Sequence, residues 1–211
     1  ILVFMPIKTN VAVLGINPGP LKIMEVELPD PGPHQVVVKQ YASGICHSQL
    51  HQMQRPRKTA QALGHESTGS VVMLGSEVRH VKEGDMVIVT WIPRDKVNNP
   101  RKVEWSSVNL PDGSVATTSN IFTWAEYTIV DEQYVVKVPP QTKRDVTSII
   151  GCAVITGAGA VENTVTVKPG NSVAIFGIGG VGLSAIVAAK QFKANPIIAV
   201  DLNKEKLKFA L

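Results

Sequence analysis

Residues 172–182 read SVAIFGIGGVG, an apolar strand that runs directly into a glycine-rich turn. In such a turn each glycine of the GxGxxG pattern has its own task. Gly177 permits the tight turn, Gly179 permits close approach of the backbone to a pyrophosphate, and Gly182 permits close packing of a helix on the strand. The stretch therefore predicts a dinucleotide-binding turn.

A helix and a second strand follow this turn. Residues 183–192 are rich in alanine and read as a helix. The N–H groups at its start, at Gly180 and Val181, offer hydrogen bonds and a partial positive charge to phosphates. Residues 196–201 read as the second strand, which completes one βαβ unit and ends at Asp201.

The carboxylate of Asp201 is expected to bind the adenosine ribose hydroxyls and to repel a 2′-phosphate. This favours NAD over NADP as the cofactor. The alternative is a purely structural turn between strand and helix, followed by an incidental aspartate.

The first two-thirds of the chain reads as short strands separated by turns. The expected strands are 36–39, 69–74, 86–90, 127–130 and 134–138. Many short strands at close spacing predict a β-barrel or sandwich. Residues 93–120 are polar and aperiodic, and we expect a long loop there.

The character of the sequence changes near residue 150. We expect two domains, 1–150 and 151–211. Because a single βαβ unit cannot build a doubly wound sheet, the second domain is expected to be incomplete and the chain to be truncated.

The composition is that of a soluble globular protein, with 44% hydrophobic and 18% charged residues. The net charge of +4 is scattered, and we interpret the basic groups at 55–58 and 94–102 as solvated loops. With only 5% aromatic residues, no nucleic-acid surface is indicated. No apolar run could span a membrane. The opening Ile1–Pro6 is too short for a signal peptide and is interpreted either as a first strand or as residues foreign to the natural protein. Two cysteines indicate a reducing, cytosolic compartment.

Cysteine and histidine are the ligands that zinc prefers in proteins. Taken singly, Cys46 and Cys152 would more often be buried apolar groups, and His65 a structural histidine. Their local sequences favour a different interpretation. Residues 44–51 read GICHSQLH, residues 64–66 read GHE, and residues 151–157 read GCAVITG.

These segments, in this order and followed by the glycine-rich turn, resemble the zinc-dependent medium-chain alcohol dehydrogenases. The resemblance extends from about Lys8 to Leu211 and implies a mixed β and α/β fold. A GroES-like β-barrel would be followed by the first part of a Rossmann-type doubly wound parallel sheet. The implied reaction is hydride transfer between NAD and a small alcohol, giving an aldehyde or ketone. Intact relatives are expected to be homodimers or homotetramers.

The resemblance also implies roles for individual residues. Cys46, His65 and Cys152 would hold one catalytic zinc, with Glu66 beside it as an electrostatic tuner. Ser48 would take the alcohol proton and His51 would pass it towards solvent.

Further roles concern the cofactor and substrate. His47 would contact the pyrophosphate, Thr156 would lie under the nicotinamide, and Lys206 would join Asp201 at the adenosine ribose. Trp91 falls where the family places an aromatic residue of the substrate pocket, but a core tryptophan at a strand end is an equally good interpretation.

The sequence departs from the family pattern at two places that matter for metals. Residues 93–111 contain no cysteine, whereas many members bind a structural zinc there, so we expect no second metal. Gln49 replaces an aspartate that usually hydrogen-bonds the zinc-bound histidine. Glutamine can accept the ring N–H but adds no charge, so we expect weaker zinc binding or activity.

Three alternatives remain open at this stage. The first is a zinc-free quinone or enone reductase of the same fold. The second is a non-catalytic relative that binds a nucleotide or a protein partner. The third is a redox pair between Cys46 and Cys152.

Overall fold

A computed structural model describes residues 6–94 and 101–211 of the chain. The chain divides into two compact units, Ile1–Gly151 (unit 1) and Cys152–Leu211 (unit 2). Residues 1–5 of the expected first strand, and Lys96 of the second basic group, lie outside the described residues.

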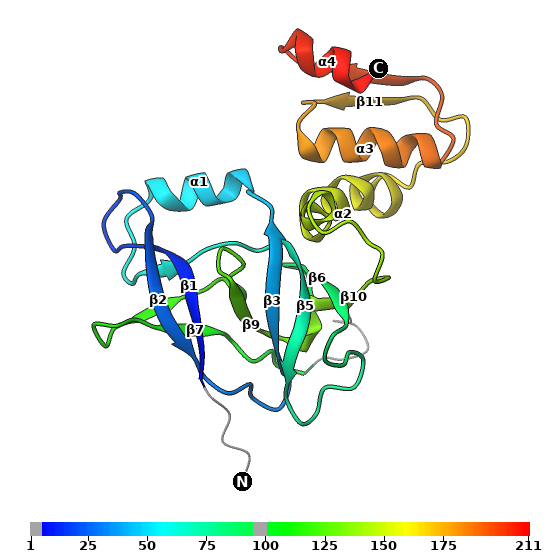
Figure 1. Ribbon diagram of the computed structural model, residues 1–211. Coiled ribbons are helices and arrows are strands. Elements are labelled where there is room, and N and C mark those ends of the chain that lie inside the picture. Colours follow the sequence, from blue (N-terminus) through cyan, green and yellow to red (C-terminus); the bar gives the residue numbers. More distant parts are fainter. Residues whose placement is uncertain (1–5, 95–100) are drawn as a thin grey trace. The chain divides into compact units, whose positions relative to one another are not determined.

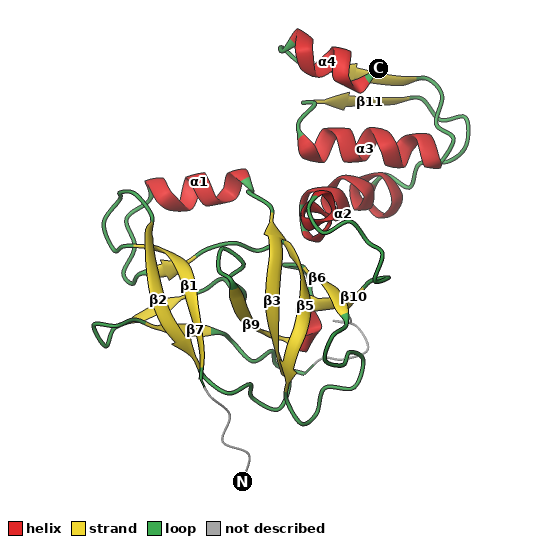
Figure 2. Ribbon diagram, viewed as in Figure 1, coloured by secondary structure: helices red, strands yellow, loops and turns green. Residues whose placement is uncertain are grey.

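Unit 1 is built from two five-stranded sheets (Figures 1 and 2). The first has the order β2-β1-β4-β8-β7, with β1 at Ile7–Leu14, β2 at Lys22–Leu28, β4 at Gln61–Ala62, β7 at Ser107–Asn109 and β8 at Val115–Thr117. The second has the order β10-β6-β5-β3-β9, with β3 at Gln35–Ser43, β5 at Ser67–Leu74, β6 at Met86–Val89, β9 at Tyr127–Asp131 and β10 at Val135–Lys137. The helical elements are α1 at His47–Gln54 and the 3-10 turns η1 at Glu132–Tyr134 and η2 at Val146–Gly151.

Strand β3, which lies between β5 and β9, is apolar on both faces, and this explains its continuous run of valines. Val37 joins Ile129 in a core shared by both sheets. Val36 and Val38 belong to a second core formed by the strands of their own sheet. Because successive side chains of a strand point to opposite faces, only a strand buried on both sides needs apolar residues at consecutive positions.

The interpretation of residues 93–120 as a long loop is wrong in its second half. β7 and β8 form an antiparallel hairpin there, in which Val108 pairs with Ala116. Both side chains are buried, whereas their neighbours in the strands are exposed. Strands of three residues are too short for their alternation to stand out from the sequence.

Unit 2 contains the predicted βαβ unit. β11 (Val173–Phe176) and β12 (Ile197–Val200) pair in parallel, and α3 (Gly180–Gln191) packs on both strands (Figure 1). The remaining helices are α2 at Ala153–Gly159, the π-helical turn η3 at Ala160–Thr164 and α4 at Lys204–Ala210. The small residues Ala185, Ala188 and Ala189 of α3 make up the centre of this core. The helical segment formed by α2 and η3 had not been predicted.

None of the helices in the described parts of the chain is long and apolar enough to cross a bilayer.

Candidate metal centre and nucleotide-binding turn

Cys46, His65 and Cys152 come together in the structure. One ligand atom from each, the two Sγ atoms and a ring nitrogen, all lie within 4.8 Å of one another, and each residue is partly buried. Cys46 immediately precedes α1, His65 lies between β4 and β5, and Cys152 directly follows the last residue of η2. Two thiols and an imidazole form a donor set that suits zinc.

The loop that presents Cys46 depends on a glycine. A Cβ at Gly44 would lie 2.6 Å from the carboxyl carbon of Glu66, so only glycine leaves room for this side chain. The loop is held on both sides, because Gly44 N–H donates to Glu66 O (3.1 Å) and Trp124 Nε1–H donates to Gly44 O (3.0 Å). Glu66 is only 2% exposed, which places its carboxyl group beneath the Cys46 loop.

His65 occupies a site that favours its neutral form. Burial lowers the pKa of His65 below the usual histidine value. The ring is therefore neutral near pH 7, and a neutral imidazole is the form that binds a metal.

The structure gives Gln49 a different partner from the one expected. Its Oε1 accepts a hydrogen bond from Cys46 N–H (3.1 Å), so the side chain caps the start of α1. No hydrogen bond joins Gln49 to His65 among the described residues. Gln49 is 1% exposed and its Nε2 is buried without a hydrogen-bond partner within the described chain. The hydrogen bond that glutamine could accept from the histidine ring is therefore not formed here, and weaker zinc binding or activity stays a prediction.

Helix α1 carries the residues predicted for proton transfer. Ser48 Oγ–H donates to Cys46 Sγ (3.3 Å), which places this hydroxyl beside a candidate ligand. His51 lies one turn further along the helix, and its ring meets that of His47 edge to face at 5.0 Å between centroids. All three side chains are exposed to solvent.

The end of α1 is held by Arg57, which is not the solvated basic residue expected from the sequence. Its guanidinium donates to the carbonyl oxygens of Gln52 and Met53 in the last turn of the helix. It also reaches Gly15 O in the loop after β1. Carbonyls at a helix C-terminus lack partners within the helix, so these bonds tie α1 to the barrel.

Trp91 is not a core residue. Its side chain is 48% exposed, directly after β6. The interpretation as a core tryptophan is therefore wrong, and a role in substrate binding stays a prediction.

The glycine-rich turn of unit 2 has the geometry that its sequence requires. Gly177 adopts a φ of +88°, a backbone conformation that side chains rarely permit. A Cβ on Gly182 would collide with Gly177 O, so the helix packs closely on the turn only because position 182 is glycine. Gly179 precedes α3, and Gly180 and Val181 form its exposed first turn.

Asp201 directly follows β12 and contacts the glycine-rich turn. Its two carboxylate oxygens accept hydrogen bonds from Asn203 N–H (2.8 Å) and Ile178 N–H (2.7 Å). These bonds hold the pKa of Asp201 below its usual value, so it is ionised at neutral pH. Lys206 Nζ lies 4.0 Å from the same carboxylate. Thr156 lies exposed on α2.

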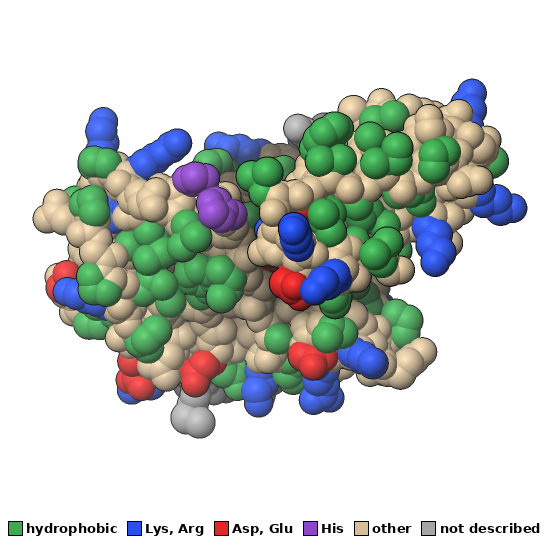
Figure 3. All heavy atoms as spheres, turned by 90° about the horizontal axis from the view of Figure 1, so that it is seen from above, with side chains coloured by type: hydrophobic (Ala, Val, Ile, Leu, Met, Phe, Trp, Pro, Cys, Tyr) green, Lys and Arg blue, Asp and Glu red, His purple; other side chains and the backbone are tan. Residues whose placement is uncertain are grey.

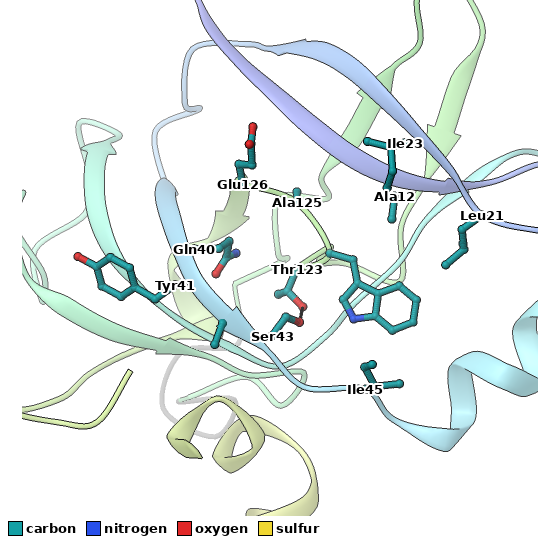
Figure 4. A pocket seen from close by; sticks show the side chains of 12 residues that line it. Ala12, Leu21, Ile23, Gln40, Tyr41, Ser43, Ile45, Thr123, Ala125 and Glu126 are labelled. Carbon is teal, nitrogen blue, oxygen red and sulfur yellow. Dashed lines mark hydrogen bonds between the residues drawn. The ribbon is translucent and has the colours of Figure 1, made fainter. Parts of the chain in front are cut away.

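An apolar pocket of about 610 Å³ opens on unit 1 beside the Cys46 loop (Figure 4). Ile45, Leu21 and Ile23 line it, and at its inner end the hydroxyls of Ser43 and Thr123 lie 2.8 Å apart. Figure 3 shows hydrophobic side chains gathered on this part of unit 1, next to histidine side chains. None of the residues predicted to bind metal or cofactor is among the residues lining this pocket.

Most of the strand-rich unit 1 matches a known protein family. Residues 32–140 match the family described as the alcohol dehydrogenase GroES-like domain. The chain belongs to the medium-chain alcohol dehydrogenase family. This confirms the resemblance drawn from the sequence and the predicted GroES-like barrel. Solved structures that superpose on nearly the whole chain confirm that the first part of a Rossmann-type sheet follows the barrel.

The similarity to individual relatives extends beyond residues 32–140 and covers nearly the whole chain. S-(hydroxymethyl)glutathione dehydrogenase of Escherichia coli O1:K1 / APEC is 34% identical over 224 residues, covering 94% of this chain and 60% of the relative. The alcohol dehydrogenase zinc-binding domain protein from Burkholderia ambifaria superposes with a TM-score of 0.88 at 27% identity, over 98% of this chain and 62% of that protein. Acetophenone reductase from Geotrichum candidum, solved in complex with NAD, gives a TM-score of 0.79 at 26% identity, over 98% and 62% of the two chains. This alcohol dehydrogenase homologue thus spans about three-fifths of the length of such relatives.

Proposed function

We propose that the protein is a zinc-dependent oxidoreductase that transfers a hydride between a small alcohol and NAD, giving an aldehyde or ketone. The observation that carries the proposal is the convergence of Cys46, His65 and Cys152, with one ligand atom each within 4.8 Å. Three protein ligands leave the fourth position of a tetrahedral zinc for substrate, as catalytic sites require. The family membership and an NAD-bound structural relative support the same reaction class.

A bound zinc would polarise the alcohol hydroxyl, and the nicotinamide of NAD would accept the hydride. The residues of α1 would handle the proton. Ser48, whose hydroxyl lies 3.3 Å from Cys46 Sγ, would take it from the alcohol. His51, exposed one turn later, would release it to solvent. Glu66, buried beneath the Cys46 loop, would adjust the electrostatic potential at the metal.

The cofactor would be held by the glycine-rich turn and its neighbours. The N–H groups of Gly179, Gly180 and Val181 would face the pyrophosphate, and Gly177 and Gly182 would shape the turn. His47 would contact the pyrophosphate, Thr156 the nicotinamide, and Asp201 with Lys206 the adenosine ribose. Trp91 would line the substrate pocket. We further propose a homodimer or homotetramer in a reducing, cytosolic compartment for the intact protein.

The metal is tested by elemental analysis of the wild-type protein and of Cys46→Ala. We expect about one zinc per chain in the wild type and a small fraction of one in the variant, since a three-ligand site cannot lose a thiolate and keep its affinity. Leu50→Ala, an exposed position of the same helix, is the matched control and should retain its zinc.

Turnover is tested by NAD reduction with a panel of alcohols, using the full-length protein. A wild-type protein without zinc, whose reductase activity survives Cys46→Ala, would instead support a zinc-free quinone or enone reductase. NAD binding without turnover of any alcohol would support a non-catalytic relative.

Cofactor choice is tested by Asp201→Asn. Because the carboxylate is ionised and would repel a 2′-phosphate, its neutralisation should shift the ratio of NADP to NAD affinity towards NADP by on the order of tenfold. Titration calorimetry with both nucleotides measures the ratio. Glu205→Gln, an exposed carboxylate on α4, should leave it unchanged. An unchanged ratio in Asp201→Asn would contradict the role of Asp201.

A further inference from the structure

The third candidate ligand, Cys152, depends on the residue before it. Gly151 is buried, and a Cβ there would collide with the carbonyl oxygen of Val89 in β6. Only glycine therefore allows the chain to pass this close to the strand. Glycine, however, also leaves the backbone free to rotate, so close approach alone does not orient the next peptide.

A buried hydroxyl removes this freedom. Thr90 Oγ–H, at the end of β6, donates to Gly151 O at 2.8 Å, and Thr90 is 6% exposed. The hydroxyl oxygen of Thr90 itself accepts from Ile92 N–H at 3.3 Å, and Thr90 N–H donates to Tyr134 O at 2.9 Å. The threonine is thus held by its backbone, and both hydrogen-bonding functions of its hydroxyl are in use.

The carbonyl of Gly151 and the nitrogen of Cys152 lie in one rigid peptide plane. A hydrogen bond that sets the direction of the carbonyl therefore sets the orientation of the plane from which Cys152 departs. We infer that Thr90 is a positioning residue for the zinc site, which acts through the Gly151–Cys152 peptide to aim the Cys152 thiol at Cys46 and His65. This inference rests on the proposed zinc site.

The role of Thr90 is tested by Thr90→Val, which keeps the shape of the side chain and removes the hydroxyl. Zinc affinity, measured by competition with a chromogenic chelator, should fall on the order of tenfold, the size of effect seen when a group that orients a metal ligand is removed. Cobalt(II) substitution provides a second readout, because the thiolate-to-cobalt absorption band should weaken or shift when Cys152 no longer points at the metal. Thr90→Ser keeps the hydroxyl and should restore both signals.

Thr128→Val is the matched control. Thr128 is a fully buried threonine of β9, in the sheet whose strand β6 ends just before Thr90, and its hydroxyl has no hydrogen-bond partner within the described chain. This variant should bind zinc and cobalt like the wild type. If Thr90→Val fails to fold, Thr90→Cys offers a side chain of similar size with a weaker hydrogen-bond donor. The zinc affinity of Thr90→Cys should then be measurable but lower than that of the wild type and of Thr90→Ser.

The outcomes are separable. Tight zinc binding by the wild type and equally tight binding by Thr90→Val would overturn the role of Thr90 alone. Equal losses in Thr90→Val and Thr128→Val would also overturn it, because the effect would then belong to the sheet. Absence of zinc binding by the wild type would overturn the proposed zinc site, and the role of Thr90 with it.

Discussion

Replacing Asp131 by alanine should lower the free energy of unfolding of unit 1 by about 3–5 kcal/mol, the cost of leaving a buried charge without its partner. Asp131 is completely buried at the end of β9. Its carboxylate accepts two hydrogen bonds from Arg101, through Nη1 and Nη2 at 2.9 Å each. It also accepts from Glu104 N–H (2.6 Å) and Gln133 N–H (2.9 Å).

Three of these bonds, two from Arg101 and one from Glu104, tie the segment after residue 100 to the barrel. This segment belongs to the cysteine-free region for which no second metal was expected, and a bidentate arginine–carboxylate pair anchors it. The sequence-based interpretation of Arg101 as a solvated basic residue is therefore wrong. When this carboxylate is removed, the segment that it holds and the neighbouring part of the barrel should lose their ordered structure together.

Denaturant unfolding of the metal-free protein measures the loss. Glu25→Gln is the control, since Glu25 forms an exposed pair with Lys8 at 3.7 Å, and such pairs contribute about 0–1 kcal/mol. A loss below about 1 kcal/mol in Asp131→Ala would contradict the anchoring role, because it would equal that of a surface pair.

Replacing Gly64 by alanine should destabilise unit 1 by about 2–5 kcal/mol and abolish zinc binding, through two separate effects. Gly64 has a φ of +96°, which is strained for any side chain. A Cβ there would also lie 2.5 Å from Thr123 Oγ1 and collide with Trp124 N. Relief of this clash would move His65, the next residue, away from the two cysteines.

Two other glycines separate the effects. Gly84 has a φ of +82° but open space around its Cβ position, so Gly84→Ala should show the backbone strain alone, about 1–2 kcal/mol. Gly15 has neither feature, and Gly15→Ala should be close to neutral. Thermal unfolding measures the loss of stability in each variant, and elemental analysis measures its zinc content. Equal stability losses in Gly64→Ala and Gly84→Ala, with zinc retained, would contradict the packing argument.

The fold could be predicted from the sequence wherever the signal is local. The valine run within β3, the turn before β6 and the glycine-rich turn each occur in one continuous segment, and each forms as expected. The hairpin β7–β8 could not be predicted in this way. Each strand has three residues, and its stability comes from burying Val108 and Ala116 in a core supplied by other strands.

For the candidate site, the sequence indicated the candidate metal ligands but not the hydrogen bonds that hold the surrounding segments in place. Cys46, His65 and Cys152 were proposed from short motifs that resemble a family. The sequence indicated only that Gln49 could accept the ring N–H of the histidine. It did not reveal that the side-chain oxygen of Gln49 caps α1 instead. Arg57 was interpreted as a solvated loop residue. Its hydrogen bonds to the last turn of α1 involve carbonyls only four and five residues away, so a C-terminal cap by this arginine could have been predicted from the sequence.

What the sequence by itself indicated is therefore the candidate reacting groups, the glycine-rich turn and the succession of short strands and turns that builds the barrel, since each depends on residues close together in the chain. The tertiary structure alone decided how these groups are held. Thr90 meets Gly151, and Arg101 meets Asp131, across long separations in the chain. A hydrogen bond of this kind leaves no periodic pattern in the sequence, because it depends on where folding brings two backbones together. The glycine-rich turn has its signature within eleven consecutive residues, whereas the candidate metal centre forms only when three distant segments come together in the fold.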